Sequence, residues 1–207
     1  MATAIFYAVD LGELRHWIGR GEPKALAAVR RALRESEDFD WEPEEEAILD
    51  RLLERLVMEG RLYEGLNEEE RYYLTQLLVD LFDEFVEAEA VSEEIPLARL
   101  APVAQRLRDA GGVAAQATEW LTRGRELNGQ EPLIPPGVDP EDLLPYFGYL
   151  ERAELPAVIE ALERSASTVS PPQPSRARRR PDRTAEDLLA AARLCAQTDR
   201  DLLDFVG

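Results

Sequence analysis

Apolar residues recur three and four positions apart over much of the chain, which is the spacing of one face of an α-helix. The clearest stripe covers residues 67–85, where Asn67 precedes three glutamates and can cap a helix. A second stripe covers residues 48–57 behind Pro43, a residue that suits the first turn of a helix. A short turn separates the two stripes, so the pattern predicts an antiparallel helix pair.

Helix start and stop signals of the same kind divide the rest of the first 164 residues. Asp10 can cap a helix, and the paired glycines at 111–112 close another. We expect these further helices over residues 11–18, 23–33, 96–110, 113–127 and 153–164. Residues 5–9 are apolar and rich in strand formers, so a short extended segment is expected there.

Prolines crowd residues 131–149 and are interleaved with apolar and aromatic side chains. A mobile linker would have few such side chains to bury. The composition therefore favours an ordered strap that packs in an extended form across the helices.

The last 43 residues have a different texture. Residues 165–183 contain four prolines and five arginines against one aspartate, which is typical of a flexible linker. Thr184 can then cap an amphipathic helix that we expect over residues 184–207. A helix behind a flexible linker is a common docking element, and its predicted contacts are Leu188, Leu189, Leu202 and Phe205. Whether it docks on another chain, including a second copy, or on a groove of its own domain stays open.

These patterns predict a mainly α fold, and the abundance of Leu, Ala, Glu and Arg agrees with that prediction. The expected organisation is a single helical domain over residues 1–164, with a short N-terminal extended segment and a Pro-rich strap. The linker over residues 165–183 and the C-terminal helix over residues 184–207 follow it.

Charge is concentrated in one stretch. Residues 35–94 hold 22 acidic residues and 4 arginines, a net charge of −18, while the remaining residues balance to zero. Such a surface repels nucleic acid and anionic lipid at long range and attracts basic proteins. The chain therefore combines a neutral body with an acidic helical block.

The composition also bears on the cellular setting. A single cysteine excludes an intrachain disulfide, and no apolar run approaches the length of a membrane span. We expect a cytoplasmic protein without a membrane partner.

The chain lacks the residues for several familiar chemistries. Its one histidine, His16, and its one cysteine, Cys195, cannot supply a zinc site, and no third group near them in sequence indicates a nucleophile–base pair. The glycines match no phosphate-binding loop. We therefore expect no cofactor and no catalytic residue.

One carboxylate cluster deserves comparison with a metal site. Asp80, Asp83, Glu84 and Glu87 share neighbouring sides of one expected helix, as in the all-α nucleotide pyrophosphohydrolases that bind Mg²⁺ or Mn²⁺. Those enzymes need a second carboxylate pair on the next helix, where this chain offers only Glu119 and Glu126. A solvated helix face explains the cluster more simply.

Two segments carry a resemblance. The start FYAVDLGEL (residues 6–14) and the later PLIPPG and LLPYFGYLERAEL (within residues 132–155) resemble a family of uncharacterised bacterial proteins. That family has a YAVDL-type start, a helical body and a Pro-rich segment that runs into a GYL turn. The resemblance covers residues 1–164 and implies a bacterial domain without implying an activity.

The sequence therefore favours a protein–protein interaction module, such as an adaptor, an inhibitor or an immunity-type protein, over an enzyme. It would act through its acidic face or its C-terminal helix on a partner of unknown identity, with a basic protein favoured. The alternatives are a metal-dependent nucleotide hydrolase and an acidic mimic of nucleic acid.

Overall fold

The computed structural model describes residues 2–35, 45–60, 65–86, 88–125, 127, 133–134, 137, 139, 146–168 and 183–207. The chain forms a mixed α/β fold around a five-stranded antiparallel sheet, so the prediction of a mainly α fold is wrong. The strands are β1 (Thr3–Val9), β2 (Glu89–Ala90), β3 (Ile95–Pro96), β4 (Tyr146–Leu150) and β5 (Asp201–Val206).

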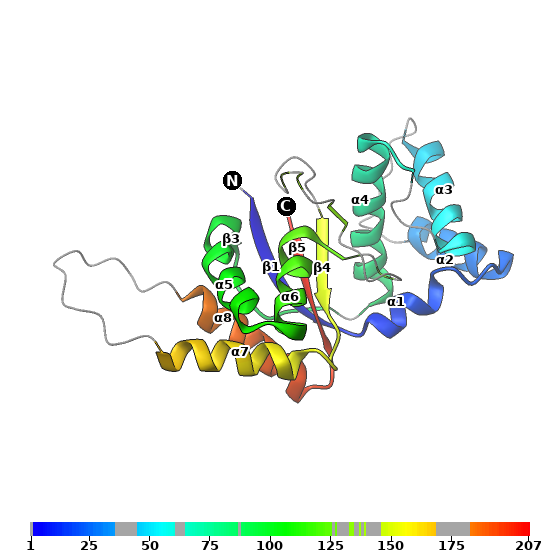
Figure 1. Ribbon diagram of the computed structural model, residues 1–207. Helices are drawn as coiled ribbons and strands as arrows, with labels where there is room; N and C mark the ends of the chain where they lie inside the picture. Colours follow the sequence, from blue (N-terminus) through cyan, green and yellow to red (C-terminus); the bar gives the residue numbers. More distant parts are fainter. Residues whose placement is uncertain are drawn as a thin grey trace.

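The strand that ends the chain lies in the middle of the sheet. β5 pairs with β1 from Ala4↔Val206 to Val9↔Asp201 and with β4 on its other side. The backbones of Thr3 and Gly207 also exchange two hydrogen bonds, of 2.9 and 3.1 Å. Thr3 and Gly207 are therefore neighbours at one end of the sheet, where Figure 1 marks the two ends of the chain side by side.

The C-terminal prediction fails at this strand. A helix over residues 184–207 was expected, whereas α8 (Thr184–Gln197) ends before the turn that leads into β5. Five of the six residues of β5 are buried. A strand that is covered on both faces shows an apolar run without alternation, which periodicity cannot distinguish from a buried helix.

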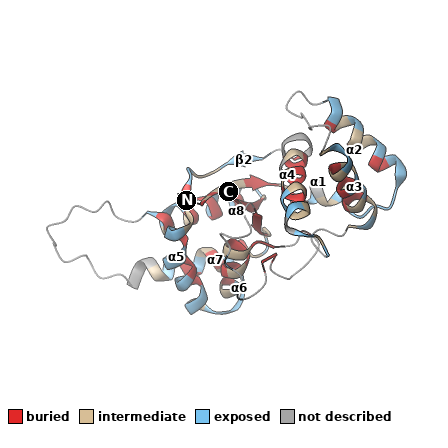
Figure 2. Ribbon diagram, turned by 90° about the horizontal axis from the view of Figure 1, so that it is seen from above, coloured by how far each residue is buried: buried red, intermediate tan, exposed pale blue. Residues whose placement is uncertain are grey.

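Four helices cover one face of the sheet. They are α5 (Leu97–Ala110), α6 (Gly112–Arg123), α7 (Leu155–Thr168) and α8. α6 packs on β4, α8 packs on β1 and β5, and α5 and α7 pack against these two helices (Figures 1 and 2). The apolar stripe of α8, which includes Leu188, Ala192 and Cys195, is buried against the sheet.

The remaining helices form a separate group beside β4, which we call the helical lobe (Figure 1). It consists of α1 (Leu11–Trp17), α2 (Pro23–Glu35), α3 (Glu46–Glu54), the π-helix η1 (Arg55–Glu59) and α4 (Glu68–Phe85). Phe82 of α4 meets Phe147 of β4 with ring centroids 6.1 Å apart. Because successive strand residues point to opposite faces, this contact lies on the face opposite to α6, which packs at Gly148.

The helix pair of the lobe confirms its prediction. Asn67 and Glu70 form a capping box at the start of α4, and Asp10 caps α1 through the amide of Gly12. Within the two predicted apolar stripes, Leu52, Leu56, Leu77 and Leu81 are all buried, while the side chain of Phe85 lies outside the described residues.

The glycines at 19 and 21 have a structural role in this lobe. Their amides donate to the carbonyl oxygens of Leu56 (3.0 Å) and Val57 (3.3 Å) in η1. A Cβ atom on Gly19 would lie 3.2 Å from the Cα atom of Gly60, and Gly19 has a φ of 67°. The loop between α1 and α2 is therefore hydrogen-bonded to the π-helix, and the carbonyl group of Leu56 accepts the amide of Gly60 (3.1 Å) as well.

The two Pro-rich segments are described only at their borders. The predicted linker lies outside the described residues from 169 to 182, and residues 165–168 belong to α7. In the predicted strap, Leu133 and Ile134 are buried and donate backbone hydrogen bonds to the carbonyl groups of Gly124 and Arg123. The prediction that the strap extends to residue 149 is wrong at its end, because Tyr146–Leu150 form a fully buried strand.

Candidate functional site

The acidic block is partly neutralised by α2. Arg30 donates to both carboxylate oxygens of Asp50, at 2.6 and 2.7 Å, and lies 3.6 Å from Glu54. Arg34 pairs with Glu46 at 3.0 Å. The side of α3 that faces α2 therefore presents less negative charge than its sequence indicates.

The start of α4 presents a different surface, which we call the acidic aromatic patch (Glu45, Glu69, Tyr72 and Tyr73). Tyr72 is 49% exposed, the most of any large hydrophobic residue in the described part of the chain. Its ring meets that of Tyr73 edge to face, with centroids 5.7 Å apart, and the Tyr73 hydroxyl donates to Glu45 at 3.1 Å. Glu69 is exposed beside them.

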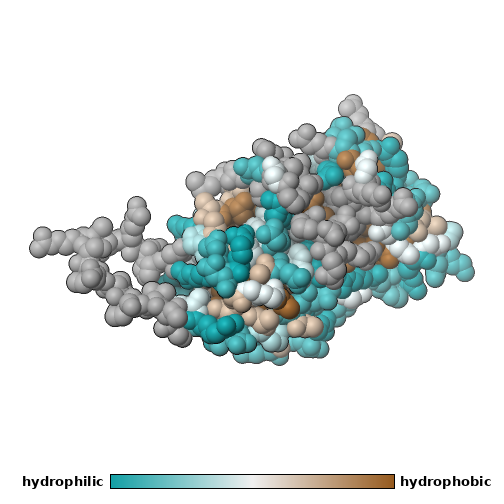
Figure 3. Space-filling view, in the orientation of Figure 1, coloured by the Kyte–Doolittle hydropathy of each residue, from teal (hydrophilic) through white to brown (hydrophobic). Residues whose placement is uncertain are grey.

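The pKa of Tyr73 indicates the sign of the electrostatic potential at this patch. Its hydrogen bond to Glu45 raises the pKa of Tyr73, and desolvation and the charges of Glu45 and Glu69 raise it further. A phenol that resists ionisation beside two carboxylates indicates a locally negative potential, which attracts cations. In Figure 3 the visible surface of the lobe is largely hydrophilic and is interrupted by apolar spots.

Most of the predicted carboxylate cluster lies outside the described side chains, so the structure does not test it as a metal site. Asp80 is half-buried on α4, and the side chains of Asp83, Glu84 and Glu87 lie outside the described residues. Glu119 lies on α6, across the sheet from α4, and pairs with Arg108 of α5 at 3.6 Å, while Glu126 is not described. Within the described residues, no group of three or more His, Cys, Asp or Glu side chains could hold a metal ion.

The two candidate nucleophiles lie apart and serve other contacts. His16 is exposed, with Nε2 2.6 Å from a nitrogen of Arg20 and its ring edge to face with Trp17. Cys195 is fully buried, and burial raises its pKa to about 12. Its thiol is therefore neutral and shielded at ordinary pH.

The predicted docking residues pack within the chain itself. Leu188 and Leu202 are buried, at 1% and 0% exposure, while Leu189 and Phe205 are half-buried against the same core. Of the two arrangements left open by the sequence, the structure shows the one in which the C-terminal segment packs on its own domain.

Sequence reasoning missed an arginine–aromatic stack beside β4. The buried guanidinium of Arg125 lies 3.8 Å from the ring centre of Trp120 and 4.5 Å from that of Tyr149, and it pairs with Glu154 at 2.8 Å. Burial raises the pKa of Tyr149, although the charges of Arg125 and Arg15 oppose the shift. Cation–π contacts of this kind strengthen when they are desolvated.

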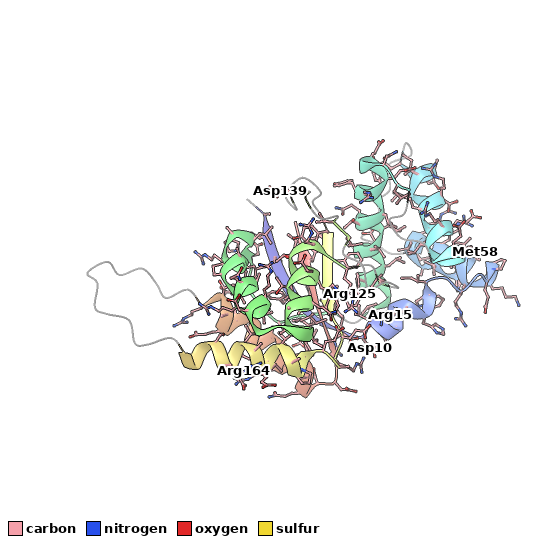
Figure 4. All side chains as sticks on the ribbon, viewed as in Figure 1. Asp10, Arg15, Met58, Arg125, Asp139 and Arg164 are labelled. Atoms are coloured by element: carbon pink, nitrogen blue, oxygen red, sulfur yellow. The ribbon has the colours of Figure 1, made fainter. Side chains whose placement is uncertain are left out.

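Arg15 links this stack to the helical lobe. From α1 it donates to Tyr149 (3.0 Å), to Glu151 (2.8 Å) and to the carbonyl oxygen of Leu127 (2.9 Å). Figure 4 shows Arg15 and Arg125 at the junction of α1 with the sheet. The donors of Arg15 are thus directed at its own chain, which indicates a structural link between the lobe and β4.

A second charged cluster, the Asp201 cluster, closes the same end of the sheet. Asp201 accepts hydrogen bonds from the amides of Leu11 (3.1 Å) and Arg152 (2.8 Å), and the Arg152 guanidinium also reaches Asp10 at 3.1 Å. Asp10 and Leu11 follow β1, Arg152 follows β4, and Asp201 begins β5, so all four residues lie at the same end of these three strands. Their proximity could be predicted only from strand pairing, which the sequence pattern did not reveal.

A shallow hollow of about 310 Å³ lies between α3, η1 and the start of α4. It is lined by Arg51, Leu52, Glu54, Arg55, Glu59, Gly65, Leu66 and Glu70. Arg51 and Glu70 form an ion pair with each other in its wall. Its mixed charges do not select one class of ligand.

Comparison with known proteins places the chain in a family. The family described as a domain of unknown function, DUF7691, matches residues 1–207. The chain belongs to this family. The match covers the whole chain and therefore includes α8 and β5. No curated protein and no solved structure matches the chain.

The described helices lack the properties of membrane spans. In the described part of the chain, none has the length and apolar character that crossing a bilayer requires.

Proposed function

We propose that the domain is a protein-binding module, of the adaptor, inhibitor or immunity type, which binds a basic partner through the acidic aromatic patch. The observation that carries the proposal is the exposed Tyr72 ring, fixed against Tyr73 and flanked by Glu45 and Glu69. Tyrosine is enriched among the residues that dominate interface energies, and its face attracts arginine and lysine side chains.

The two edges of the sheet are less suitable than the patch as binding surfaces for a partner. The outer edge of β1 is covered by residues 89–96, where Ser92 accepts a hydrogen bond from Phe6 and exposed Glu93 and Glu94 follow. Charged, interrupted edges of this kind disfavour the addition of a strand from another chain. On the other side of the sheet, the carbonyl group of Phe147 in β4 accepts a hydrogen bond from Arg125. A helical surface is therefore the better contact.

An octa-arginine peptide is a suitable probe for the test, with fluorescence anisotropy as the measurement. The wild-type domain should bind it, and the affinity should fall steeply between about 50 and 200 mM salt, because the attraction is electrostatic and screened by ions. Glu69→Gln and Tyr72→Ala should each weaken binding several-fold.

Glu186→Gln on α8 is the matched control, since it also removes one exposed carboxylate. It should leave the affinity within a factor of two of the wild type. Equal losses in Glu69→Gln and Glu186→Gln would mean that net charge alone attracts the peptide and that the patch is not the binding surface. Binding that does not depend on salt would contradict the electrostatic basis of the proposal.

A further inference from the structure

Asp204 lies in the middle of the central strand, where an ionised side chain is difficult to accommodate. It is fully buried, and its neighbours across the sheet are Phe6 on β1 and Gly148 on β4. One carboxyl oxygen accepts the amide of Gly148 at 2.8 Å. The other has no hydrogen-bond partner within the described residues.

The covering helix brings a second acceptor to the same place. A Cβ atom on Gly148 would lie 2.1 Å from the carbonyl oxygen of Trp120 and 2.6 Å from a carboxyl oxygen of Asp204. Only glycine leaves room for both groups, so α6 and Asp204 meet over this residue. An ionised carboxylate would place negative charge near a carbonyl oxygen in a dry site, whereas a protonated carboxyl group is neutral and avoids that cost.

The charged groups around Asp204 do not compensate for ionisation. Tyr146 lies on the same face of β4, and its hydroxyl group donates a hydrogen bond to the carbonyl group of Thr122. The positive charge of Arg123 interacts with Tyr146. Burial first, and then the Asp204 charge, raise the pKa of Tyr146. From α8, the titratable Cys195 faces the Asp201 end of the strand and is neutral.

We propose that Asp204 is held as a neutral carboxylic acid and acts as a pH-sensitive element of the sheet, in which ionisation weakens the contact of β4 and β5 with α6. Desolvation also raises the pKa of Asp204 well above its ordinary value. The proposal concerns the sheet and does not depend on the function proposed for the helical lobe.

The sign of the pH effect follows from the raised pKa. Below the pKa of the unfolded chain, about 3.9 for an aspartate, both states are protonated and the contribution of Asp204 is fully present. As the pH rises towards the pKa of the folded state, only the unfolded chain releases the proton. Each pH unit in that window lowers the folded-to-unfolded ratio about tenfold through this group.

The test compares urea unfolding of the wild type and Asp204→Asn between pH 4 and pH 8. Asparagine is neutral at every pH, can accept from Gly148 and can donate towards Trp120, so it should preserve the local contacts. Relative to the wild type, the variant should gain about tenfold in folding equilibrium per pH unit above about pH 4. Parallel pH profiles for the two proteins would overturn the proposal.

A second measurement uses the wild type alone and applies even if the variant fails to fold. Infrared spectroscopy of protein labelled with ¹³C at the aspartate carboxyl carbons should show a protonated C=O stretch at pH 7. Its absence at pH 7, with every aspartate in the carboxylate form, would also overturn the proposal.

Discussion

The helical lobe and the sheet bury similar apolar side chains, but they differ in how far apart in the chain their contacts lie. Within the lobe, α3 packs on α4 across one short connection, and a local capping box begins α4. In the sheet, β1 pairs with a strand at the other end of the chain. Local apolar periodicity therefore predicts most helices of the lobe. The sheet depends on contacts between residues that are too far apart for any short window of sequence to include.

The largest effects on stability should come from matched side-chain truncations, one in each region. Leu81→Ala in the lobe and Leu202→Ala in the sheet each remove a buried side chain and should lower the free energy of unfolding by about 2–5 kcal/mol. Denaturant unfolding followed by circular dichroism measures both. A loss below about 0.5 kcal/mol for Leu81→Ala would mean that the buried face of α4 is assigned wrongly.

A slightly smaller effect is expected where the sheet meets α6. Gly148→Ala places a Cβ atom 2.1 Å from a backbone carbonyl oxygen, which can move only with its helix, and should cost about 3 kcal/mol. Gly65→Ala in the lobe is the control, because its Cβ atom meets nothing within 4 Å. There the positive φ of 73° is the remaining cost, about 1–2 kcal/mol. A Gly148→Ala protein as stable as the wild type would contradict the close approach.

The link between the two regions can be weakened by Arg15→Met. This change keeps much of the side-chain stem and removes the hydrogen bonds to Tyr149, Glu151 and Leu127, so it should cost about 1–2 kcal/mol. If Arg15 couples the lobe to the sheet, native-state hydrogen exchange of the variant should show that amides of the lobe and amides of the sheet open with different free energies. Arg20→Met, an exposed arginine after the same helix, should change stability by less than about 0.5 kcal/mol.

The smallest effect concerns the acidic aromatic patch. Glu45→Gln removes the carboxylate that accepts from Tyr73, so the pKa of Tyr73 should fall towards its ordinary value. Ultraviolet difference titration measures the shift, and stability should change by less than about 0.5 kcal/mol. An unchanged or higher pKa would mean that Glu45 does not set the local field.

Individual residues show what the sequence could and could not predict. Asn67 with Glu70 predicted a helix start correctly, because a capping box is a local interaction. Leu202 and Phe205 were assigned to a helix because a strand buried on both faces lacks alternation. The partners of Arg125, and the contacts of Arg152 with both Asp10 and Asp201, required the fold. The acidic block could be predicted from the composition of residues 35–94, but the ion pairs that its carboxylates form with Arg30 and Arg34 could not.

The central position of β5 has a consequence for synthesis. The ribosome makes β1 first and β5 after the other described strands, so the position between β1 and β4 stays empty until β5 has been made. Until then, two strand edges with unpaired backbone groups face each other and could capture other nascent chains. The lobe, whose contacts are local, can form before β5 has been made, whereas the sheet cannot be completed until then. We therefore expect that a C-terminal truncation of only seven residues would leave the sheet incomplete.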